Sequence, residues 1–215
     1  MDSVFVLRRR VMIQRLPSKK VWNRSVVSAF TSAYASPVNT EKMKRSRTSS
    51  QVPLFTGAPA VWGKEIFGGK AAGTLRFLTG QVIPTLKQQF ALPGNVRIIL
   101  GGYSLAGLFA LWASTQTALF SGVAAASPSV WFPGWMEFEQ QNPIQAQCIY
   151  LSLGDREERT RNATMAAVGD NIRALHRELA GRGKNCTLEW NNGGHFKDTD
   201  LRTAKAFRWA MEEQA

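Results

Sequence analysis

A glycine-rich segment at residues 101–107 has the residue types and spacing of a turn that carries a nucleophilic serine. In such a turn Ser104 is held in a strained conformation between a buried strand and an apolar helix, and its hydroxyl points out of the sheet. Small residues two positions before and after the serine keep strand and helix apart, and Gly102 and Ala106 stand there. The N–H of Leu105, at the helix start, is then expected to stabilise an oxyanion. The alternative is a glycine-rich turn with an incidental serine.

A serine nucleophile needs an imidazole base, and the chain has two histidines, His176 and His195. His176 lies in the middle of an expected helix beside charged residues, which is typical of a solvated helical side chain. His195 follows Asn191–Gly194, between the last expected strand and the last expected helix. We therefore predict His195 as the base, with a loop-stabilising histidine as the alternative.

The base in turn needs a carboxylate, which fixes its tautomer and stabilises the imidazolium. Three candidates, Asp155, Glu157 and Glu158, follow directly after a strand that ends at Gly154. Glu157 stands at the third position after that glycine, so we rank it first and Asp155 second. Solvated loop acids would look the same, and the choice stays open. The chain order of serine, acid and histidine is that of the α/β-hydrolase fold.

The stretch from residue 58 to residue 209 resembles the enterochelin esterase and esterase D-like group of the α/β-hydrolases. The resemblance rests on the following motifs: Gly-Tyr-Ser-Leu-Ala-Gly at 102–107, Leu-Phe-Ala-Leu-Trp at 108–112, Ser-Pro-Ser-Val-Trp-Phe-Pro at 127–133, Leu-Ser-Leu-Gly-Asp-Arg-Glu at 151–157, Thr-Arg-Asn at 160–162 and Gly-Gly-His-Phe-Lys-Asp at 193–198. It implies Ser104 as nucleophile, His195 as base and Glu157 as acid. It also implies a substrate pocket beside Tyr103 and Trp131, although core packing is an equal alternative for Trp131.

The front of the chain departs from this family. Its members bring several strands before the conserved region, and a Trp-Asn-x-Asp segment that leads to a loop of the oxyanion site. Here Trp22-Asn23-Arg24 matches only the beginning of that segment, and 21 residues precede it. We therefore expect the N-terminal strands to be missing or altered, and the second oxyanion donor with them.

The elements that would position these residues alternate between strand and helix over most of the chain. This alternation predicts a mostly parallel sheet flanked by helices, an α/β-hydrolase-like three-layer sandwich. The expected strands are Val96–Leu100, Gly122–Ala126, Cys148–Leu153 and Cys186–Trp190. The expected helices are one with the stripe Leu75, Leu78, Val82 and Leu86, then Leu105–Ser114, Met165–Leu179 and Asp200–Met211.

The charge is unevenly distributed. The net charge is +12, of which residues 1–50 carry +9. This segment has no aromatic rhythm typical of nucleic-acid binding, so we expect no nucleic-acid partner. Ten of the 26 residues at 25–50 are Ser or Thr, which predicts a loop or linker, whereas 1–16 alternate in the manner of a strand. We expect two parts: a partly disordered basic segment at 1–56 and a hydrolase domain at 57–215.

Several classes of protein are disfavoured by composition. No apolar run reaches the length of about 18 residues that a membrane-spanning helix needs. Two cysteines, Cys148 and Cys186, and two histidines are too few for a structural metal site, and ester hydrolysis needs no cofactor. The cysteines begin strands that we expect to be neighbours. With no indication of a secretory signal, we expect reduced thiols and a cytoplasmic protein. The oligomeric state is left open.

The sequence thus favours a serine hydrolase that cleaves a small-molecule carboxylic ester through an acyl-enzyme. A pocket lined by Trp131, Phe132 and Trp135 would favour apolar or aromatic groups, unless these residues face inward. Two alternatives remain. One is a truncated, catalytically impaired relative that acts as a binding or scaffold protein. The other is an acyltransferase that uses the same three residues.

Overall fold

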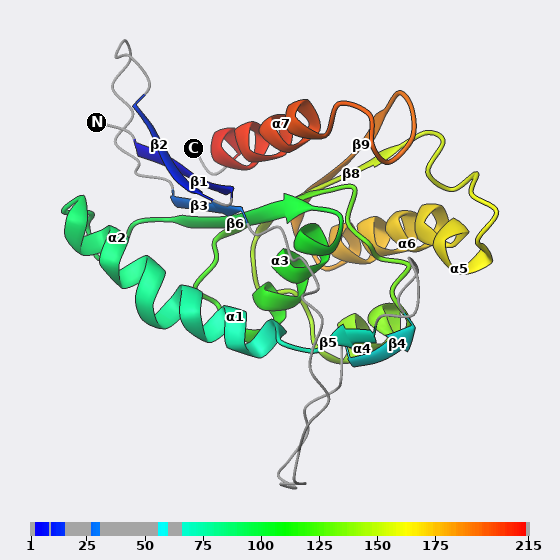
Figure 1. Cartoon of the computed structure of the whole chain (residues 1–215), viewed down its shortest axis with the longest axis horizontal. Helices are drawn as coiled ribbons and strands as arrows, with labels where there is room; N and C mark the ends of the chain where they lie inside the picture. The colour runs from blue at the N-terminus through cyan, green and yellow to red at the C-terminus, as the bar shows by residue number, and fades with distance from the viewer. Residues whose placement is uncertain (1–2, 9, 16–26, 31–55, 60–65, 214–215) are drawn as a thin grey trace, which may run out of the picture.

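A five-stranded parallel sheet occupies the centre of the structure, a computed structural model that describes residues 3–8, 10–15, 27–30, 56–59 and 66–213 (Figure 1). The strand order is β3-β6-β7-β8-β9. The bounds are β3 (Val27–Phe30), β6 (Ile98–Tyr103), β7 (Gly122–Ala126), β8 (Cys148–Gly154) and β9 (Asn185–Asn191). Every strand pair in this sheet is parallel, so all carboxyl ends lie at one edge.

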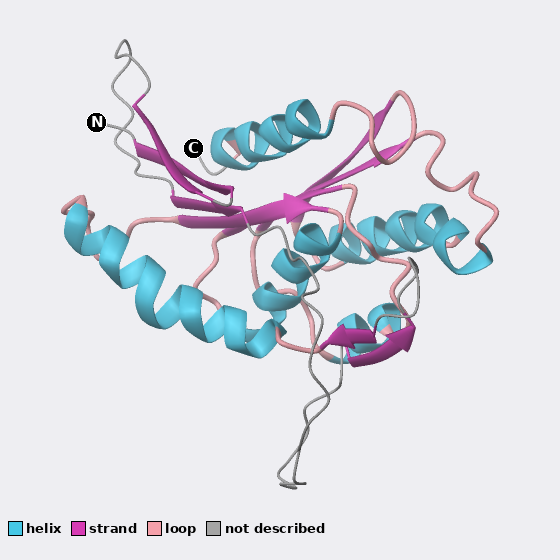
Figure 2. Ribbon diagram, viewed as in Figure 1, coloured by secondary structure: helices cyan, strands magenta, loops and turns pink. Residues whose placement is uncertain are grey.

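Helices cover both faces of the sheet (Figure 2). From β6 to β9 the strand order advances in one direction, and right-handed crossovers therefore place the connecting helices on a single face. The last helix lies on the opposite face. The helices are α1 (Ala71–Phe77), the π-helical segment η1 (Leu78–Val82), α2 (Ile83–Gln89), α3 (Leu105–Gln116), α4 (Trp135–Gln141), α5 (Ala163–Ala166), α6 (Val168–Gly181) and α7 (Thr199–Glu212).

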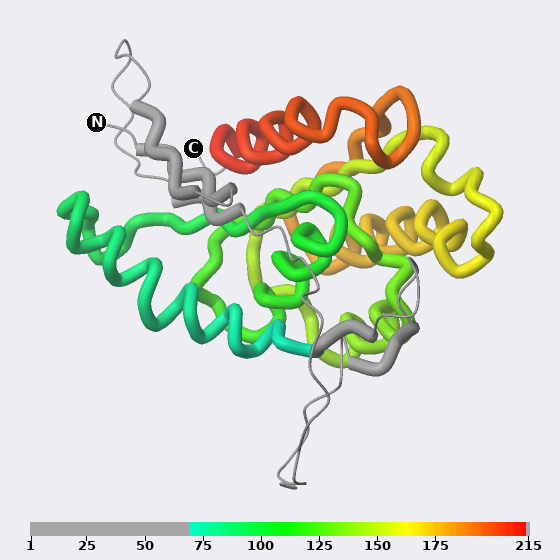
Figure 3. Tube along the Cα trace, in the orientation of Figure 1, coloured from blue at the N-terminus to red at the C-terminus, as the bar shows by residue number. Residues whose placement is uncertain are grey.

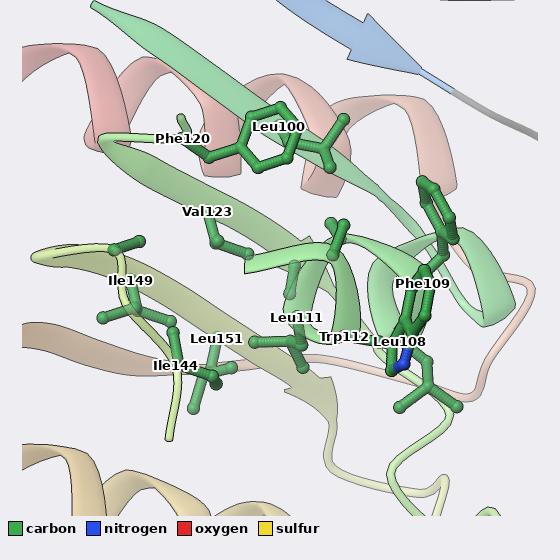
Figure 4. Close-up of a cluster of buried hydrophobic side chains, with 14 of the residues drawn as sticks. Leu100, Leu108, Phe109, Leu111, Trp112, Phe120, Val123, Ile144, Ile149 and Leu151 are labelled. Atoms are coloured by element: carbon green, nitrogen blue, oxygen red, sulfur yellow. The ribbon is translucent and has the colours of Figure 1, made fainter. Parts of the chain in front are cut away.

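Alternate residues of β6, β7 and β8 belong to two apolar clusters. Figure 4 shows the larger one, in which Leu100, Val123 and Leu151 of the sheet pack against Leu108 and Leu111 of α3. The smaller cluster lies under α7 and consists of Ile99, Ala124, Ala126, Tyr150, Ala206, Phe207 and Ala210. These two clusters hold the sheet between its helix layers. They thereby fix the position of the edge at which the strands end.

Gly101 allows α7 to approach the sheet. A Cβ at this position would lie 2.6 Å from the ring of Phe207 and 2.6 Å from the carbonyl oxygen of Ala124. Because real atoms do not come this close, no side chain fits at position 101. Gly101, three residues before Ser104, therefore determines how closely α7 packs against the sheet.

The expected fold class is confirmed. The four strands and four helices expected from the sequence occur within a few residues of their predicted bounds, but the helix expected over Met165–Leu179 is divided at Ala167 into α5 and α6. The stripe that begins at Leu75 follows α1, η1 and α2, which form one continuous helix with a π-helical turn in the middle. Sequence reasoning missed α4, which is only seven residues long.

The prediction of a loop or linker over Ser25–Ser50 needs a correction at Val27–Phe30. These four residues form β3, which pairs in parallel with the edge of β6. The pairing supplies backbone hydrogen bonds from a distant part of the chain, so a local count of hydroxyl residues could not detect it. The rest of that segment lies outside the described residues, as does the Trp22–Arg24 motif. The division at residue 56 therefore stays a prediction.

The other N-terminal strands form small separate sheets. The residues predicted as one strand at 1–16 are an antiparallel pair, β1 (Ser3–Arg8) and β2 (Arg10–Arg15), with β1 beside β3. A second antiparallel pair consists of β4 (Thr56–Pro59) and β5 (Ile66–Gly68). Among the N-terminal strands that the structure describes, only β3 joins the main sheet. That these strands are altered relative to the family stays a prediction.

The two cysteines lie on neighbouring strands with their thiols on opposite faces of the sheet. Cys148 pairs with Asn185, whereas Cys186 pairs with Ile149, and successive residues of a strand alternate between faces. Cys148 lies under α7 and Cys186 lies next to His176 of α6, so the two do not form a disulfide with each other. Over the described part of the chain, no helix is long and apolar enough to cross a membrane.

Candidate active site

Ser104 occupies a sharp turn between β6 and α3. Its backbone has φ 60° and ψ −122°, a conformation that non-glycine residues rarely adopt and that costs free energy. The turn is so tight that a Cβ at Gly102 would lie 2.5 Å from the Cβ of Ala106. The predicted need for small residues on both sides of the serine therefore has a steric basis here.

Ser104, His195 and Glu157 form a chain of hydrogen-bonding distances. The Oγ of Ser104 lies 3.0 Å from Nε2 of His195, and Nδ1 of His195 lies 2.6 Å from Oε2 of Glu157. A carboxylate only accepts hydrogen bonds, so Nδ1 carries the proton and Nε2 is left to accept from the serine hydroxyl. The arrangement can therefore move a proton away from Ser104.

Parallel strands bring these three residues together from distant parts of the sequence. Ser104 follows β6, Glu157 follows β8 and His195 follows β9, and the carboxyl ends of these strands share one edge. Backbone bonds join the acid loop to the histidine loop, from the N–H of Asp155 to Asn191 and from the N–H of Arg156 to Gly193. Figure 3 shows the two loops side by side at the end of the sheet.

Asp155, the second candidate acid, does not contact the imidazole. It is exposed, and its Oδ1 accepts a hydrogen bond of 2.7 Å from the N–H of Gly193, two residues before His195. Glu158 forms an ion pair of 2.9 Å with Arg173. Of the three carboxylates after β8, only that of Glu157 reaches the histidine ring.

Glu157 is held as a buried carboxylate, with a side chain that is 4% exposed. Three donors contact its Oε1: the Ser127 hydroxyl at 2.8 Å, the Gly154 N–H at 2.7 Å and Nη1 of Arg202 at 3.0 Å. Burial alone would raise the pKa of Glu157, but the hydrogen bond and charge of His195, with the donors Gly154 and Ser127, outweigh burial and hold this pKa below its ordinary value.

Leu105 begins α3, so its backbone N–H has no acceptor within the helix and lies at the positive end of the helix dipole. This position suits the predicted oxyanion donor beside Ser104. The Trp22–Arg24 segment, which the family resemblance connects with the second donor, lies outside the described residues. A further hydroxyl, that of Ser129, lies 3.3 Å from the Oγ of Ser104.

A small pocket of about 30 Å³ opens beside the histidine. Its lining consists of Ser127, Pro128, Trp131, Glu157, Met165, Val168 and His195. Trp131 thus lines the pocket, and its role in substrate binding stays a prediction. Phe132 and Trp135, which were candidates for the same wall, are 3% and 0% exposed and belong to the core. The volume suffices for little more than one water molecule, so a substrate must extend outward from it.

The hydroxyl of Tyr103 points toward the loops beneath the site. This group donates a hydrogen bond of 2.6 Å to the carbonyl oxygen of His195 and accepts one of 3.2 Å from Arg202. Burial raises the pKa of Tyr103, so the phenol keeps its proton for the first of these bonds. Its predicted role in substrate binding stays a prediction.

The sequence reasoning overlooked Arg202, which lies in the first turn of α7 with a side chain that is 2% exposed. A signal was present in the sequence. Arg202 falls in line with Ala206 and Ala210 at intervals of four, so it lies on the apolar face of its helix. A charged residue on such a face needs a buried partner, here Glu157.

A parallel sheet with a serine at a strand-to-helix turn, an acid after a later strand and a histidine after the last is the architecture of the α/β-hydrolases. The chain belongs to the Esterase family, whose model, described as "Putative esterase", matches residues 65–198, more than half of the chain. The match confirms the family that the sequence motifs resemble. A comparison with curated protein sequences gave no significant match.

Solved structures support the same fold. The siderophore hydrolase EstB from Aspergillus nidulans has a TM-score of 0.56 at 23% identity, over 74% of this chain and 63% of its own. EstA from the same organism has a TM-score of 0.53 at 22% identity, over 74% of this chain and 65% of its own. The enterobactin esterase FES from Shigella flexneri has a TM-score of 0.53 at 20% identity, over 66% of this chain and 38% of its own. This chain therefore spans less than two thirds of each of these proteins.

Proposed function

We propose that this protein hydrolyses carboxylic esters of small molecules, with Ser104 as nucleophile, His195 as base and Glu157 as acid. The observation that carries the proposal is the unbroken chain of hydrogen-bonding distances, 3.0 Å from Ser104 to His195 and 2.6 Å from His195 to Glu157. Membership of the Esterase family supports the reaction class.

In the first half of the reaction, the hydroxyl of Ser104 attacks the ester carbonyl carbon while Nε2 of His195 takes its proton. The carbonyl oxygen becomes an oxyanion, which the N–H of Leu105 stabilises. The ionised Glu157 stabilises the imidazolium. This imidazolium then gives its proton to the leaving alcohol, and an acyl group remains on Ser104.

In the second half, water takes the place of the alcohol. His195 accepts a proton from the water as it attacks the acyl carbon, and returns this proton to the oxygen of Ser104 when the acid leaves. An alcohol in place of water would give acyl transfer. We propose hydrolysis because membership of the Esterase family supports this reaction class.

The substrate is proposed to present an apolar or aromatic group toward Trp131, since Met165 and Val168 line the same pocket. EstA and EstB are described as siderophore hydrolases and FES as an enterobactin esterase, so siderophore esters are a suitable first series to assay. We further propose a cytoplasmic location, where the thiols of Cys148 and Cys186 would stay reduced.

The test combines a fluorophosphonate probe with hydrolysis of p-nitrophenyl butyrate. The wild-type protein and Ser129→Ala should be labelled, whereas Ser104→Ala should be neither labelled nor active. Ser129 is a matched control because its hydroxyl lies 3.3 Å from that of Ser104. A wild-type protein that resists the probe and hydrolyses no ester would instead be a binding or scaffold protein. Activity that needs an added alcohol would indicate an acyltransferase.

A further inference from the structure

Arg202 joins four segments at the carboxyl edge of the sheet. Its Nη1 lies 3.0 Å from Oε1 of Glu157, 3.2 Å from the hydroxyl of Tyr103 and 3.4 Å from that of Ser127. Its Nη2 donates a bond of 3.2 Å to the carbonyl oxygen of Asn192. The guanidinium thus contacts the loops that carry the acid, the nucleophile and the base.

The charge of Arg202 fits poorly with a purely structural role. Its side chain is 2% exposed, and, among the described residues, its Nε has no hydrogen-bond partner. A buried cation with an unsatisfied donor lowers stability, and an apolar side chain of similar volume often serves packing as well or better. The benefit of the guanidinium must therefore come from something other than filling space.

The geometry at Glu157 indicates what that benefit is. Arg202, with two neutral donors, engages Oε1, which leaves Oε2 to face Nδ1 of His195. A carboxylate held on one oxygen cannot rotate away from the ring. The adjacent cation also offsets the negative charge in a site where burial favours the protonated acid. A protonated Glu157 would no longer stabilise the imidazolium.

We propose that Arg202 is a positioning residue: it holds Glu157 ionised and in the orientation in which Oε2 accepts from His195. The proposal rests on the proposed function, because it concerns the same three residues. Arg202 acts through Glu157 and touches no substrate. It is thus expected to affect kcat and to leave KM unchanged.

The variants are Arg202→Met, which removes the charge, and Arg202→Lys, which keeps it without the fork of donors. Arg208→Met is the control, since Arg208 lies on the same helix with a side chain that is 77% exposed. We expect Arg202→Met to lower kcat about 10- to 100-fold, the scale known for groups that orient metal-binding side chains. KM should stay within about twofold. Arg202→Lys should recover part of the loss because it restores the cation.

A double-mutant cycle separates positioning from general damage. If Arg202 acts through Glu157, then Arg202→Met should cost no more than about twofold in a Glu157→Gln background. The double variant also removes both buried charges, so it keeps the test valid if Arg202→Met alone folds poorly. An equal loss of kcat in both backgrounds would refute the proposal.

An NMR measurement detects the contact between His195 and Glu157 independently of activity. The Nδ1 proton of His195, in a 2.6 Å bond to Glu157, should give a far-downfield proton signal that Glu157→Gln abolishes. Arg202→Met should broaden or remove the signal and Arg208→Met should keep it. If Arg202→Met keeps both the signal and kcat, the positioning role is wrong and the proposed function stands. If the wild-type protein hydrolyses no ester but Arg202→Met loses the signal, the proposed function is wrong and the positioning role of Arg202 stands.

Discussion

Replacing Glu157 by Gln tests the acid assignment through the tautomer of His195. Three donors converge on Oε1 of Glu157, whereas Oε2 faces Nδ1. The glutamine oxygen will take the position of Oε1, because an NH₂ group there would face only donors. Its NH₂ then points at Nδ1, which must become an acceptor. The proton moves to Nε2, where it blocks acceptance of the proton of Ser104.

The expected loss in kcat is about two to four orders of magnitude, or about 2.7–5.4 kcal/mol in the barrier, as for removal of the acid in other triads. The assay is p-nitrophenyl butyrate hydrolysis at pH 8, with thermal unfolding measured on the same samples. Asp155→Asn is the control, since the asparagine oxygen can still accept from the N–H of Gly193. It should retain most of the activity. Larger losses in Asp155→Asn than in Glu157→Gln would refute the assignment, and small losses in both would indicate a serine–histidine dyad.

Three further perturbations have defined outcomes. Trp131→Ala should raise KM for an aryl ester about tenfold, with little change for an acetate ester, because the indole lines the pocket; equal effects on both would contradict this. The lowered pKa of Glu157 stabilises the fold above an ordinary carboxyl pKa of about 4.3, and this contribution is lost as the pH falls through the lower folded value. In urea titrations, the difference in unfolding free energy between wild type and Glu157→Gln should therefore shrink as the pH falls below about 4.3. Gly102→Ala should cost about 1–3 kcal/mol in the same assay, since its Cβ meets Ala106, while Gly94→Ala, with open space around it, should cost far less.

Much of the fold was predictable because each element carries a local pattern. Gly122–Ala126 is a short apolar run between turn residues, and it forms β7 with the predicted bounds. The serine turn was recognisable because its sterics demand small residues at fixed positions, which the sequence displays. Ser104, Glu157 and His195 could be ranked because each follows a recognisable strand. Each of these features lies within a few consecutive residues.

The rest depends on contacts between distant segments. β3 is a strand because β6 offers it an edge, and nothing near Val27–Phe30 indicates that edge. Distinguishing Glu157 from Asp155 required their orientations, since both follow the same strand. The partner of Arg202 lies 45 residues away, so the sequence could show a charge on an apolar helix face but not what the charge binds.

Because α7 provides both Arg202 and the apolar cover of one sheet face, the order of protein synthesis matters. The ribosome makes Ser104, Glu157 and His195 before it makes Thr199–Glu212. A chain that stops before α7 therefore contains all three residues but exposes Ile99, Ala124 and Tyr150, which Phe207 and its neighbours would cover. Such a product presents an apolar surface to chaperones and proteases. Premature termination is thus expected to yield protein that the cell removes rather than a slow esterase.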